Sequence, residues 1–342
     1  MPYHIAINGY GRIGRCVLRA YYEARASGEK FADLKLVAIN DLADIKTLAH
    51  LTRYDSTHGR FPGNVEIQGS QLMVNGDAIA VSQHSELSHL PWRELGIDLV
   101  MECSGSFTDR ANAELHLARG AKKVLFSQPA ESDVDATVVY GINHQSLTAE
   151  ASIVSNASCT TNCIVPVIKV LADELGIESG VITTIHSAMN DQPVIDSYHH
   201  NDLRKTRSAM QSIIPVDTEL ARGIERILPN LTGLLEAQAI RVPTVNVSAM
   251  DIAVAVKTPT DSTRVNELIR LASKEFPINV LGFTEEPLAS CDFNHDLRSA
   301  VVDFNQTRVA GGRLVKLLVW FDNEWAYANR MLDVAQYMQS IG

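Results

Sequence analysis

Six residues near the start of the chain constrain its fold more than any other feature. The motif GYGRIG at 9–14 directly follows an apolar run and precedes a helix-like stretch at 15–24. In this context the first glycine permits a tight turn, the second lets the backbone approach a pyrophosphate, and the third lets a helix pack closely on a strand. The unpaired N–H groups at the start of the helix would bind the diphosphate. A plain turn is the alternative, because the glycine pattern without its context is weak evidence.

An acidic residue at the end of the second apolar run narrows the choice of cofactor. Asp41 closes the run at 34–41, where a carboxylate can accept hydrogen bonds from the hydroxyls of an adenosine ribose. It follows the glycine motif by somewhat more than the usual ~20 residues, and the polar stretch at 26–35 accounts for the excess. Its charge would repel a 2′-phosphate, so we expect NAD rather than NADP. A solvated aspartate in a turn is the alternative interpretation.

The order of apolar runs and helix-like stretches predicts the fold class. In the first part of the chain, short apolar runs at 4–9, 34–41, 98–105 and 122–127 alternate with helix-like stretches at 15–24, 44–51 and 110–120. Strands that alternate with helices in this way pair in parallel. We therefore expect an α/β domain of the Rossmann type, with a doubly wound parallel sheet.

The second half of the chain has a different pattern. Longer, partly alternating runs occupy 181–188, 237–244 and 247–257, and such runs suit a large, mostly antiparallel sheet. We expect an α+β catalytic domain there. The predicted limits are an NAD-binding domain over 1–158, a catalytic and oligomerisation domain over 159–323, and a C-terminal helix at 324–342 that completes the first domain.

Charge and cysteine content exclude several classes of function. Forty acidic residues against thirty basic ones give a net charge of −10, and no basic block offsets it, so nucleic acid and anionic membranes are improbable partners. No apolar run approaches the roughly 18–20 residues of a membrane span, and no basic leader precedes the first apolar run. Five dispersed cysteines fit a reduced, cytoplasmic compartment better than a disulfide framework.

One cysteine lies where a helix should begin. The small and polar residues at 155–158 precede a long apolar run at 164–175, so we expect a helix that starts near residue 158. Cys159 would then lie in the first turn, where free N–H groups and the helix dipole stabilise a thiolate. A thiol with a pKa of ~8.5 is only about 3% ionised at pH 7, whereas one lowered to ~6.5 is mostly ionised.

The other cysteines are interpreted as packing residues. Cys163 lies one turn beyond Cys159 on the same helix face, and a metal pair is conceivable there, but no second cysteine pair accompanies it. We therefore expect no metal site. Cys16, Cys103 and Cys291 have apolar or mixed neighbours and receive the same interpretation.

A nucleophilic thiol needs a base, and His186 is the best-placed of eleven histidines. It ends an apolar run about one helix and one strand after Cys159, and a strand end beside a helix start is where two such groups can converge. A capped or surface histidine is the alternative interpretation.

Taken together, several segments resemble the glyceraldehyde-3-phosphate dehydrogenase superfamily. They occur in order along essentially the whole chain: INGYGRIGR (7–15), VAIND (37–41), YDSTHGRF (54–61), SNASCTTNC (155–163), IIP (213–215), RVPT (241–244) and FDNEWAYANR (321–330). The resemblance implies that Cys159 attacks the aldehyde of a phosphorylated sugar and that His186 takes the thiol proton. Hydride transfer to NAD⁺ then leaves a thioester, which a second nucleophile releases.

The resemblance also implies binding roles. The cofactor contacts would be Gly9, Gly11, Arg12, Ile13, Gly14, Asp41, Ser127, Asn323 and Tyr327, with Asn323 at the nicotinamide carboxamide. The substrate contacts would be Ser158, Thr160, Arg204, Thr218 and Arg241, with Arg241 at the substrate phosphate.

Two departures from the family pattern bear on the second nucleophile. Members that form an acyl phosphate read H-S-Y-T-x-x-Q after the histidine, whereas Met189 here replaces the threonine hydroxyl with a thioether that cannot donate a hydrogen bond. After IIP those members read S-S-T-G, and Glu219 replaces the glycine. At about 4 Å and an effective dielectric of 20, its carboxylate would repel a phosphate by roughly 4 kcal/mol per charge pair, unless a cation such as Arg222 neutralises it.

These replacements, with HSAM, IIPVDT and DFNHD (292–296), resemble the erythrose-4-phosphate dehydrogenase branch. That branch oxidises D-erythrose 4-phosphate to 4-phospho-D-erythronate on the route to pyridoxal 5′-phosphate, and water is the acyl acceptor. A phosphorylating glyceraldehyde-3-phosphate dehydrogenase is the rival enzyme, and an NAD-responsive regulatory protein on the same fold is the rival from another class. The resemblance further implies a cytoplasmic homotetramer, with the segment 187–212 as an inter-subunit loop.

Overall fold

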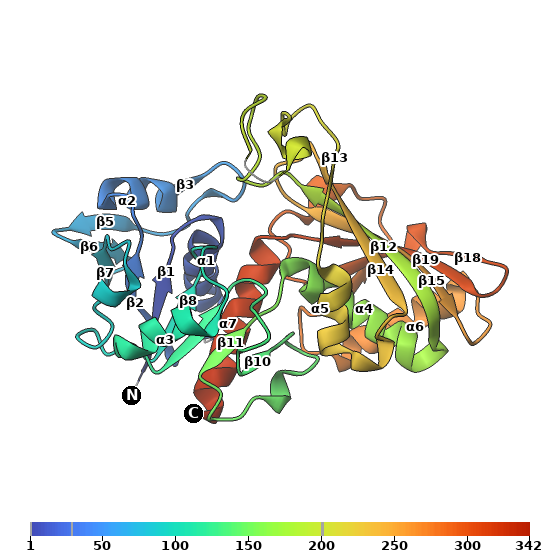
Figure 1. Ribbon diagram of the computed structural model, residues 1–342, viewed down its shortest axis with the longest axis horizontal. Helices are drawn as coiled ribbons and strands as arrows, with labels where there is room; N and C mark the ends of the chain where they lie inside the picture. The colour runs from blue at the N-terminus through green and yellow to red at the C-terminus, as the bar shows by residue number, and fades with distance from the viewer. Residues whose placement is uncertain (1, 29, 200–201) are drawn as a thin grey trace. The chain divides into compact units, whose positions relative to one another are not determined.

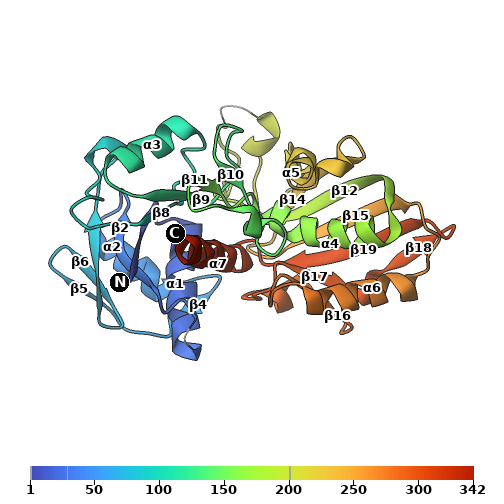
Figure 2. The ribbon, with the colours of Figure 1, turned by 90° about the horizontal axis from the view of Figure 1, so that it is seen from below.

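The computed structural model describes residues 2–28, 30–199 and 202–342, and these form two compact units. The first unit comprises residues 1–158 and 327–342, and the second comprises residues 159–326 (Figures 1 and 2). None of the helices in the described part of the chain has the length and hydropathy that a membrane span requires.

The first unit is built on a mostly parallel sheet. In spatial order its strands are β10 (Ala136–Thr137), β11 (Ile153–Ser155), β9 (Lys123–Phe126), β8 (Leu99–Glu102), β1 (Tyr3–Asn8), β2 (Leu34–Asn40), β7 (Asp77–Ser82), β6 (Gln71–Val74) and β5 (Val65–Gln68). Neighbours from β10 to β7 are parallel, whereas β6 and β5 extend the sheet antiparallel. A short hairpin pairs β3 (Tyr54–Asp55) with β4 (Gly59–Arg60).

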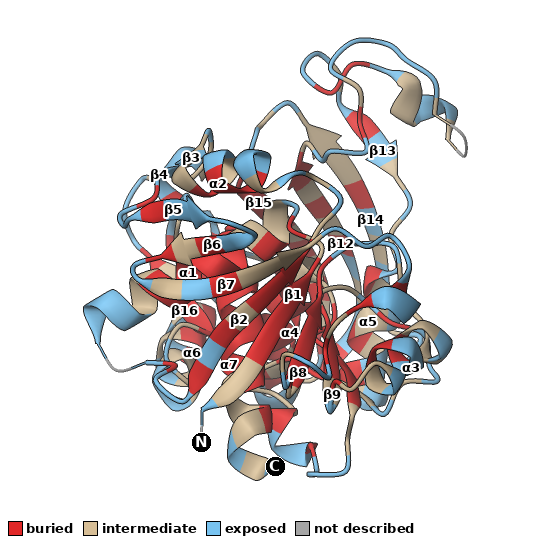
Figure 3. Cartoon of the chain, turned by 90° about the vertical axis from the view of Figure 1, so that its left-hand side faces the viewer, coloured by how far each residue is buried: buried red, intermediate tan, exposed pale blue. Residues whose placement is uncertain are grey.

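Helices cover both faces of this sheet, because alternate strand residues point to opposite sides. Ala6, Ala38 and Val100 point to one face and pack with the buried Trp92, next to α3 (Arg110–Ala118). Ile7 points to the other face and approaches Gly14 in α1 (Arg12–Ser27). The central strands β1, β2 and β8 are therefore buried on both sides (Figure 3), as the doubly wound prediction requires.

The chain order creates a crevice at the carboxyl edge of this sheet. From β1 the chain passes through α1 to β2 on one side, while β8 lies on the other side of β1. The reversal of strand order at β1 is a topological switch point, where open α/β sheets bind their ligands. The remaining helices with residues in this unit are α2 (Ile45–Arg53) and α7 (Trp325–Ile341).

The second unit contains a large mixed sheet. Its strands lie in the order β13 (Ile214–Val216), β14 (Leu235–Val242), β12 (Ile177–Ser187), β15 (Ser248–Val256), β19 (Leu314–Phe321), β17 (Ala300–Asp303) and β16 (Leu281–Thr284), and β18 (Arg308–Ala310) also pairs with β19. Only β12–β14 and β16–β17 are parallel among these described pairs, so the prediction of a mostly antiparallel sheet is confirmed.

Three helices pack on one face of that sheet (Figure 2): α4 (Cys159–Leu175), α5 (Leu220–Ile227) and α6 (Ser262–Glu275). The predicted helix near residue 158 begins at Cys159. Short 3₁₀ turns complete the described chain: η1 (Leu87–His89), η2 (His144–Ser146), η3 (Leu203–Thr206), η4 (Pro229–Leu231), η5 (Ser290–Phe293) and η6 (Phe304–Gln306).

Candidate active site

The glycine motif forms the turn from β1 into α1. Gly9 has a φ of +87°, and a Cβ there would lie 2.4 Å from the backbone of Ser104, which follows β8. A Cβ on Gly14 would lie 2.3 Å from the carbonyl oxygen of Gly9. A Cβ on Gly11 would meet nothing within 4 Å. The first and third glycines are thus required by the protein's own packing, and the space over the second is open to a ligand.

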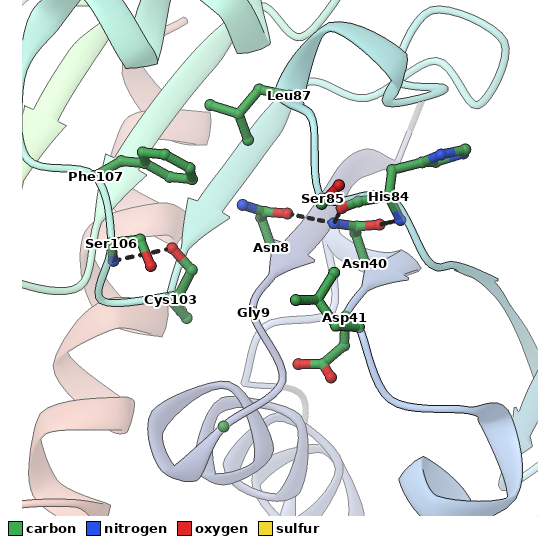
Figure 4. A pocket seen from close by; sticks show the side chains of 13 residues that line it. Asn8, Gly9, Asn40, Asp41, His84, Ser85, Leu87, Cys103, Ser106 and Phe107 are labelled. Atoms are coloured by element: carbon green, nitrogen blue, oxygen red, sulfur yellow. Dashed lines mark hydrogen bonds between the residues drawn. The ribbon is translucent and has the colours of Figure 1, made fainter. Parts of the chain in front are cut away.

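A cavity of about 320 Å³ lies beside this turn. Loops that follow β1, β2, β7 and β8 line it, with the side chains of Leu87 and Phe107 on its apolar side (Figure 4). Asp41 lies at its edge, where Oδ2 accepts a hydrogen bond from the backbone N–H of Tyr10 at 2.7 Å and Oδ1 accepts one from Ala43 at 2.9 Å. Each carboxylate oxygen retains a lone pair for a further donor such as a ribose hydroxyl.

These features fit an adenine dinucleotide. The volume falls within the usual range for a ligand pocket of about 300–1,000 Å³, and the pocket combines apolar walls with a few fixed polar groups. The helix that begins at Arg12 has no side-chain cap, so its first N–H groups can bind a diphosphate. A carboxylate at the end of the second strand, as Asp41 is here, is the residue type that favours NAD over NADP.

Other predicted cofactor residues have structural partners of their own. The guanidinium of Arg12 forms a two-point ion pair with Asp55, at 2.5 and 3.2 Å, and this pair lowers the pKa of Asp55 against the opposing effect of burial. Ile13 is half-buried in the first turn of α1, and Ser127 directly follows β9. Tyr327 is buried, and its hydroxyl donates to the carbonyl of Ala157 at 2.8 Å.

The predicted nucleophile and base meet in the second unit. Cys159 is the first residue of α4, and His186 lies one residue before the end of β12. The Sγ of Cys159 is 3.9 Å from Nε2 of His186. Nδ1 of the same ring is 2.8 Å from the carbonyl of Ser187, and since a carbonyl can only accept, Nδ1 carries the proton. Nε2 of the neutral ring is therefore an acceptor that faces the thiol, as a general base must.

The resting charge of the thiol differs from the prediction. Burial raises the pKa of Cys159 to about 11, and this outweighs the stabilising amides of Thr160 and Cys159 and the nearby Arg241. Burial also lowers the pKa of His186, while its hydrogen bond to Ser187 acts in the opposite direction. The prediction that the helix start alone lowers the thiol pKa is wrong here, because desolvation of the thiolate is the larger effect. Ionisation of the thiol therefore depends on proton transfer to His186.

A cation lies beside the base. Arg241 on β14 is the register partner of His186 on β12, so the two side chains share a face of the sheet. Nη1 of Arg241 donates to Asp191 at 2.5 Å and to Gln192 at 3.2 Å. Within the described part of the chain this guanidinium bonds through Nη1 alone, which leaves Nη2 and Nε for an anionic ligand.

Asn323 is oriented by two hydroxyl groups. Ser187 and Ser248 donate to its Oδ1 at 3.1 and 2.9 Å. The adjacent Asp322 is buried and accepts from the backbone N–H groups of Glu324 and Trp325, which fixes the turn that carries Asn323. With Oδ1 occupied, the amide NH₂ of Asn323 is presented as a donor, which suits an acceptor such as a carboxamide oxygen.

The remaining predicted substrate residues are more dispersed. Thr218 accepts from the backbone N–H of Leu220 at 3.2 Å, at the start of α5. Thr160 lies in the first turn of α4, Ser158 directly precedes that helix, and Arg204 lies exposed in η3.

The carboxylate that was expected to repel phosphate is compensated. Glu219 pairs with Arg222 at 2.8 Å, and both side chains are more than 70% exposed. The repulsion of roughly 4 kcal/mol predicted for Glu219 therefore does not apply, because the pair is neutral and screened by solvent. One prediction about cysteine packing is also wrong: Cys16, Cys103 and Cys163 are buried, but Cys291 lies exposed in η5.

Two family models match the chain. The NAD-binding domain of glyceraldehyde 3-phosphate dehydrogenase matches residues 3–110, and the C-terminal domain of the same enzyme matches residues 158–323. The chain belongs to the glyceraldehyde-3-phosphate dehydrogenase family. Its cofactor is NAD, and it is an NAD-dependent oxidoreductase that acts on an aldehyde of a small sugar phosphate.

Sequence reasoning missed several residues that support this family site. Ser248 helps to orient Asn323, Asp191 pairs with Arg241, and Asp55 pairs with Arg12. Asp55 was within reach of the sequence, because it belongs to the YDSTHGRF segment that the family shares. The other two have no local sequence signal, since their partners lie far away in the chain.

Proposed function

We propose that the chain oxidises D-erythrose 4-phosphate to 4-phospho-D-erythronate and that water releases the product. The observation that carries the chemical step is the 3.9 Å approach of the Cys159 thiol to an unprotonated Nε2 of His186. The substrate assignment rests on the resemblance of the HSAM, IIPVDT and DFNHD segments to the erythrose-4-phosphate dehydrogenase branch.

In the oxidation step, Nε2 of His186 accepts the thiol proton while Sγ of Cys159 forms a bond to the aldehyde carbon. The oxygen of the adduct takes this proton from the His186 imidazolium, which gives a neutral thiohemiacetal and a neutral imidazole. His186 then accepts that hydroxyl proton as the C–H bond breaks, and the carbon becomes a thioester. NAD, when bound, supplies the hydride acceptor for this step.

Before the release step, His186 loses to solvent the proton that it accepted during oxidation. Water then attacks the thioester carbon, and Nε2 of His186 accepts a proton from this water. The C–S bond breaks, the imidazolium returns that proton to the Cys159 thiolate, and the carboxylic acid loses its own proton to solvent and leaves as a carboxylate. The same histidine thus serves as a base in both half-reactions, which its neutral, buried state allows.

Two side chains support the proposed substrate and the proposal that water is the acyl acceptor. Arg241 offers its free guanidinium nitrogens to the 4-phosphate, and Met189, which is 46% exposed, offers no hydrogen-bond donor to a second anion. A phosphorylating enzyme that acts on glyceraldehyde 3-phosphate is the second candidate. It is favoured by the Glu219–Arg222 ion pair, which removes the charge that would have repelled inorganic phosphate.

The experiment compares both aldehydes with and without inorganic phosphate. We expect a higher kcat/KM for erythrose 4-phosphate, a rate that is independent of phosphate, and 4-phospho-D-erythronate as the product by mass spectrometry. Acyl-phosphate formation comparable with carboxylate formation would refute release by water. A preference for glyceraldehyde 3-phosphate would refute the substrate assignment.

We also propose that the chain assembles as a homotetramer through the segment 187–212, whose residues 200–201 lie outside the described structure. This segment exposes Val194, Ile195, Tyr198 and Leu203, each more than 70% accessible, and such apolar exposure is typical of a surface that a partner covers. Light scattering coupled to gel filtration tests the assembly, and a monomer at micromolar concentration would contradict it. The free cysteines of the described chain agree with a cytoplasmic location, and the product would feed pyridoxal 5′-phosphate synthesis.

A further inference from the structure

A hydrogen-bonded row of buried or half-buried polar side chains, here called the ladder, crosses the carboxyl edge of the first sheet. Four neighbouring strands, β7, β2, β1 and β8, end in Ser82, Asn40, Asn8 and Glu102. Ser82 Oγ donates to Asn40 Oδ1 at 3.0 Å, Asn40 Nδ2 donates to Asn8 Oδ1 at 2.8 Å, and Asn8 Nδ2 donates to Glu102 Oε2 at 2.6 Å. Figure 4 shows the Asn8–Asn40 bond between the two strand ends that line the dinucleotide cavity.

The ladder continues beneath the sheet through a histidine. Nε2 of His116 lies 3.0 Å from Glu102 Oε2, and Nδ1 of His116 lies 3.0 Å from Nε1 of Trp92. Because the indole N–H can only donate, Nδ1 must be the acceptor, and His116 is the neutral Nε2–H tautomer that donates to Glu102. Trp92, His116 and Glu102 are completely buried.

Three donors therefore converge on one carboxylate. Glu102 Oε2 accepts from Asn8 and from His116, and Oε1 accepts from the backbone N–H of Ser104 at 2.8 Å. An ionised carboxylate accepts at both oxygens, whereas a glutamine presents one acceptor and one NH₂ donor. A glutamine here would place its NH₂ group either against the donors of Asn8 and His116 or against the backbone N–H of Ser104. His116 cannot change tautomer to relieve the first conflict, because its Nδ1 must accept from Trp92.

Glu102 thereby fixes both walls of the crevice. Its bond to Ser104 holds the loop after β8 where a Cβ on Gly9 would be only 2.4 Å from the Ser104 backbone. Its bond to Asn8 sets the amide orientation of Asn8, and through it that of Asn40, whose Oδ1 also accepts from the backbone N–H of His84 at 2.9 Å. Hydrogen bonds thus connect the loops after β1, β2, β7 and β8 to one buried carboxyl group, that of Glu102.

We propose that Glu102 is a positioning residue for NAD, and that it acts through Asn8 and Ser104 with its own orientation fixed by His116 and Trp92. The ladder prearranges the cavity, so binding does not have to order it. Its loss should weaken NAD binding without a direct effect on the thiol, since Cys159 belongs to the other unit.

The first test compares Glu102→Gln with Glu94→Gln, a matched change at an exposed position of the same unit. The dissociation constant of NAD is measured by fluorescence quenching well below the melting temperature, and the apoprotein's Cys159 is titrated with a thiol reagent. The free variant can relieve the conflict by moving the loops that line the cavity, and NAD binding must then restore the conflict. The cost of one buried unsatisfied donor thereby becomes a loss of about tenfold or more in affinity. We expect Glu102→Gln to show that loss with unchanged thiol reactivity, and Glu94→Gln to show neither change.

A second pair keeps the inference testable if Glu102→Gln fails to fold. His116→Gln can donate to Glu102 and accept from Trp92, whereas His116→Leu can do neither. We expect NAD affinity close to wild type for His116→Gln and a several-fold loss for His116→Leu, and ¹⁵N NMR of the wild-type apoprotein should show the Nε2–H tautomer of His116. The inference is overturned by a lower melting temperature with unchanged NAD affinity, by equal affinities for the two His116 variants, or by the Nδ1–H tautomer.

Discussion

The charge state of Cys159 should depend on His186. In the wild type the imidazole, with Nε2 3.9 Å from the sulfur, can take the thiol proton, so a thiolate forms without loss of a proton to solvent. At that distance and an effective dielectric of 20, the thiolate and imidazolium attract each other by about 4 kcal/mol. This attraction raises the ion-pair population about a thousandfold above that of two non-interacting groups. In His186→Asn the thiolate must form by release of the proton to solvent.

The magnitude follows from the raised pKa of the partly buried thiol. With a pKa raised to about 11, a cysteine without its base is ionised to only about one part in 10⁴ at pH 7, and this fraction rises tenfold for each pH unit. The thiolate is the alkylating species. We therefore expect His186→Asn to react with iodoacetamide at least tenfold more slowly than wild type at pH 7, with a rate that climbs steeply to pH 10. The wild-type rate should vary only weakly with pH between the pKa of His186 and the pKa of Cys159.

The assay is the second-order rate of iodoacetamide modification of the apoenzyme between pH 5 and 10, with Cys159→Ala as the blank for the other thiols. Superimposable pH profiles for wild type and His186→Asn would refute the reasoning, because they would show that the thiol ionises without the imidazole. The same variant should lower the oxidation rate by about 10²–10⁴-fold, the usual contribution of a positioned base.

Three further changes test other parts of the structure. Gly9→Ala places a Cβ 2.4 Å from the Ser104 backbone at a φ of +87°, so unfolding in urea should show a loss of about 2–4 kcal/mol, and unchanged stability would contradict the packing. Ala157 has a φ of +54°, so Ala157→Gly should raise the free energy of unfolding by up to about 1 kcal/mol, whereas a loss would show that the turn is unstrained. The carboxylate of Asp322 accepts hydrogen bonds from four donors, two of which belong to Asn246 and His295. Asp322→Asn replaces one of its oxygens with an NH₂ donor, and the KM for NAD should rise if the backbone turn at Asp322 orients Asn323.

The parts of the site that sequence predicted have local signals. The glycine motif stands between a strand and a helix, and the structure shows why two of its positions exclude a side chain. Cys159 follows small and capping residues, and α4 begins at that residue. The sequence predicted a parallel sheet in the first half of the chain and a mostly antiparallel sheet in the second, because the length and spacing of the apolar runs reflect which strand faces are buried.

The parts that sequence did not predict depend on contacts between distant residues. Arg241 and Asp191 are 50 positions apart, and Asn323 and Ser187 are 136 apart, so no periodicity brings them together. The sign of the Cys159 pKa shift also required the structure. A helix start predicts a lower value, but the depth of burial, which tertiary packing sets, reversed it.

The effect of Glu219 on phosphate binding likewise required the structure. The sequence placed a carboxylate near an anion site and named Arg222 as a cation that could neutralise it, but could not show whether the two side chains pair. Its ion pair with Arg222, at the exposed start of α5, gives the charge little effect on a bound phosphate. The proposed release by water therefore rests on Met189, and the proposed substrate rests on the HSAM, IIPVDT and DFNHD segments, not on electrostatic repulsion.

A single-turnover experiment tests the covalent chemistry at the centre of this account most directly. The enzyme is mixed rapidly with erythrose 4-phosphate and excess NAD⁺, NADH is followed by absorbance, and the quenched protein is digested for mass spectrometry. The account predicts a burst of one NADH per Cys159 thiol and an acyl adduct on the peptide that contains this residue. The account would be contradicted by NADH production without a burst and without an adduct on the Cys159 peptide. Continued turnover by Cys159→Ala would also contradict it.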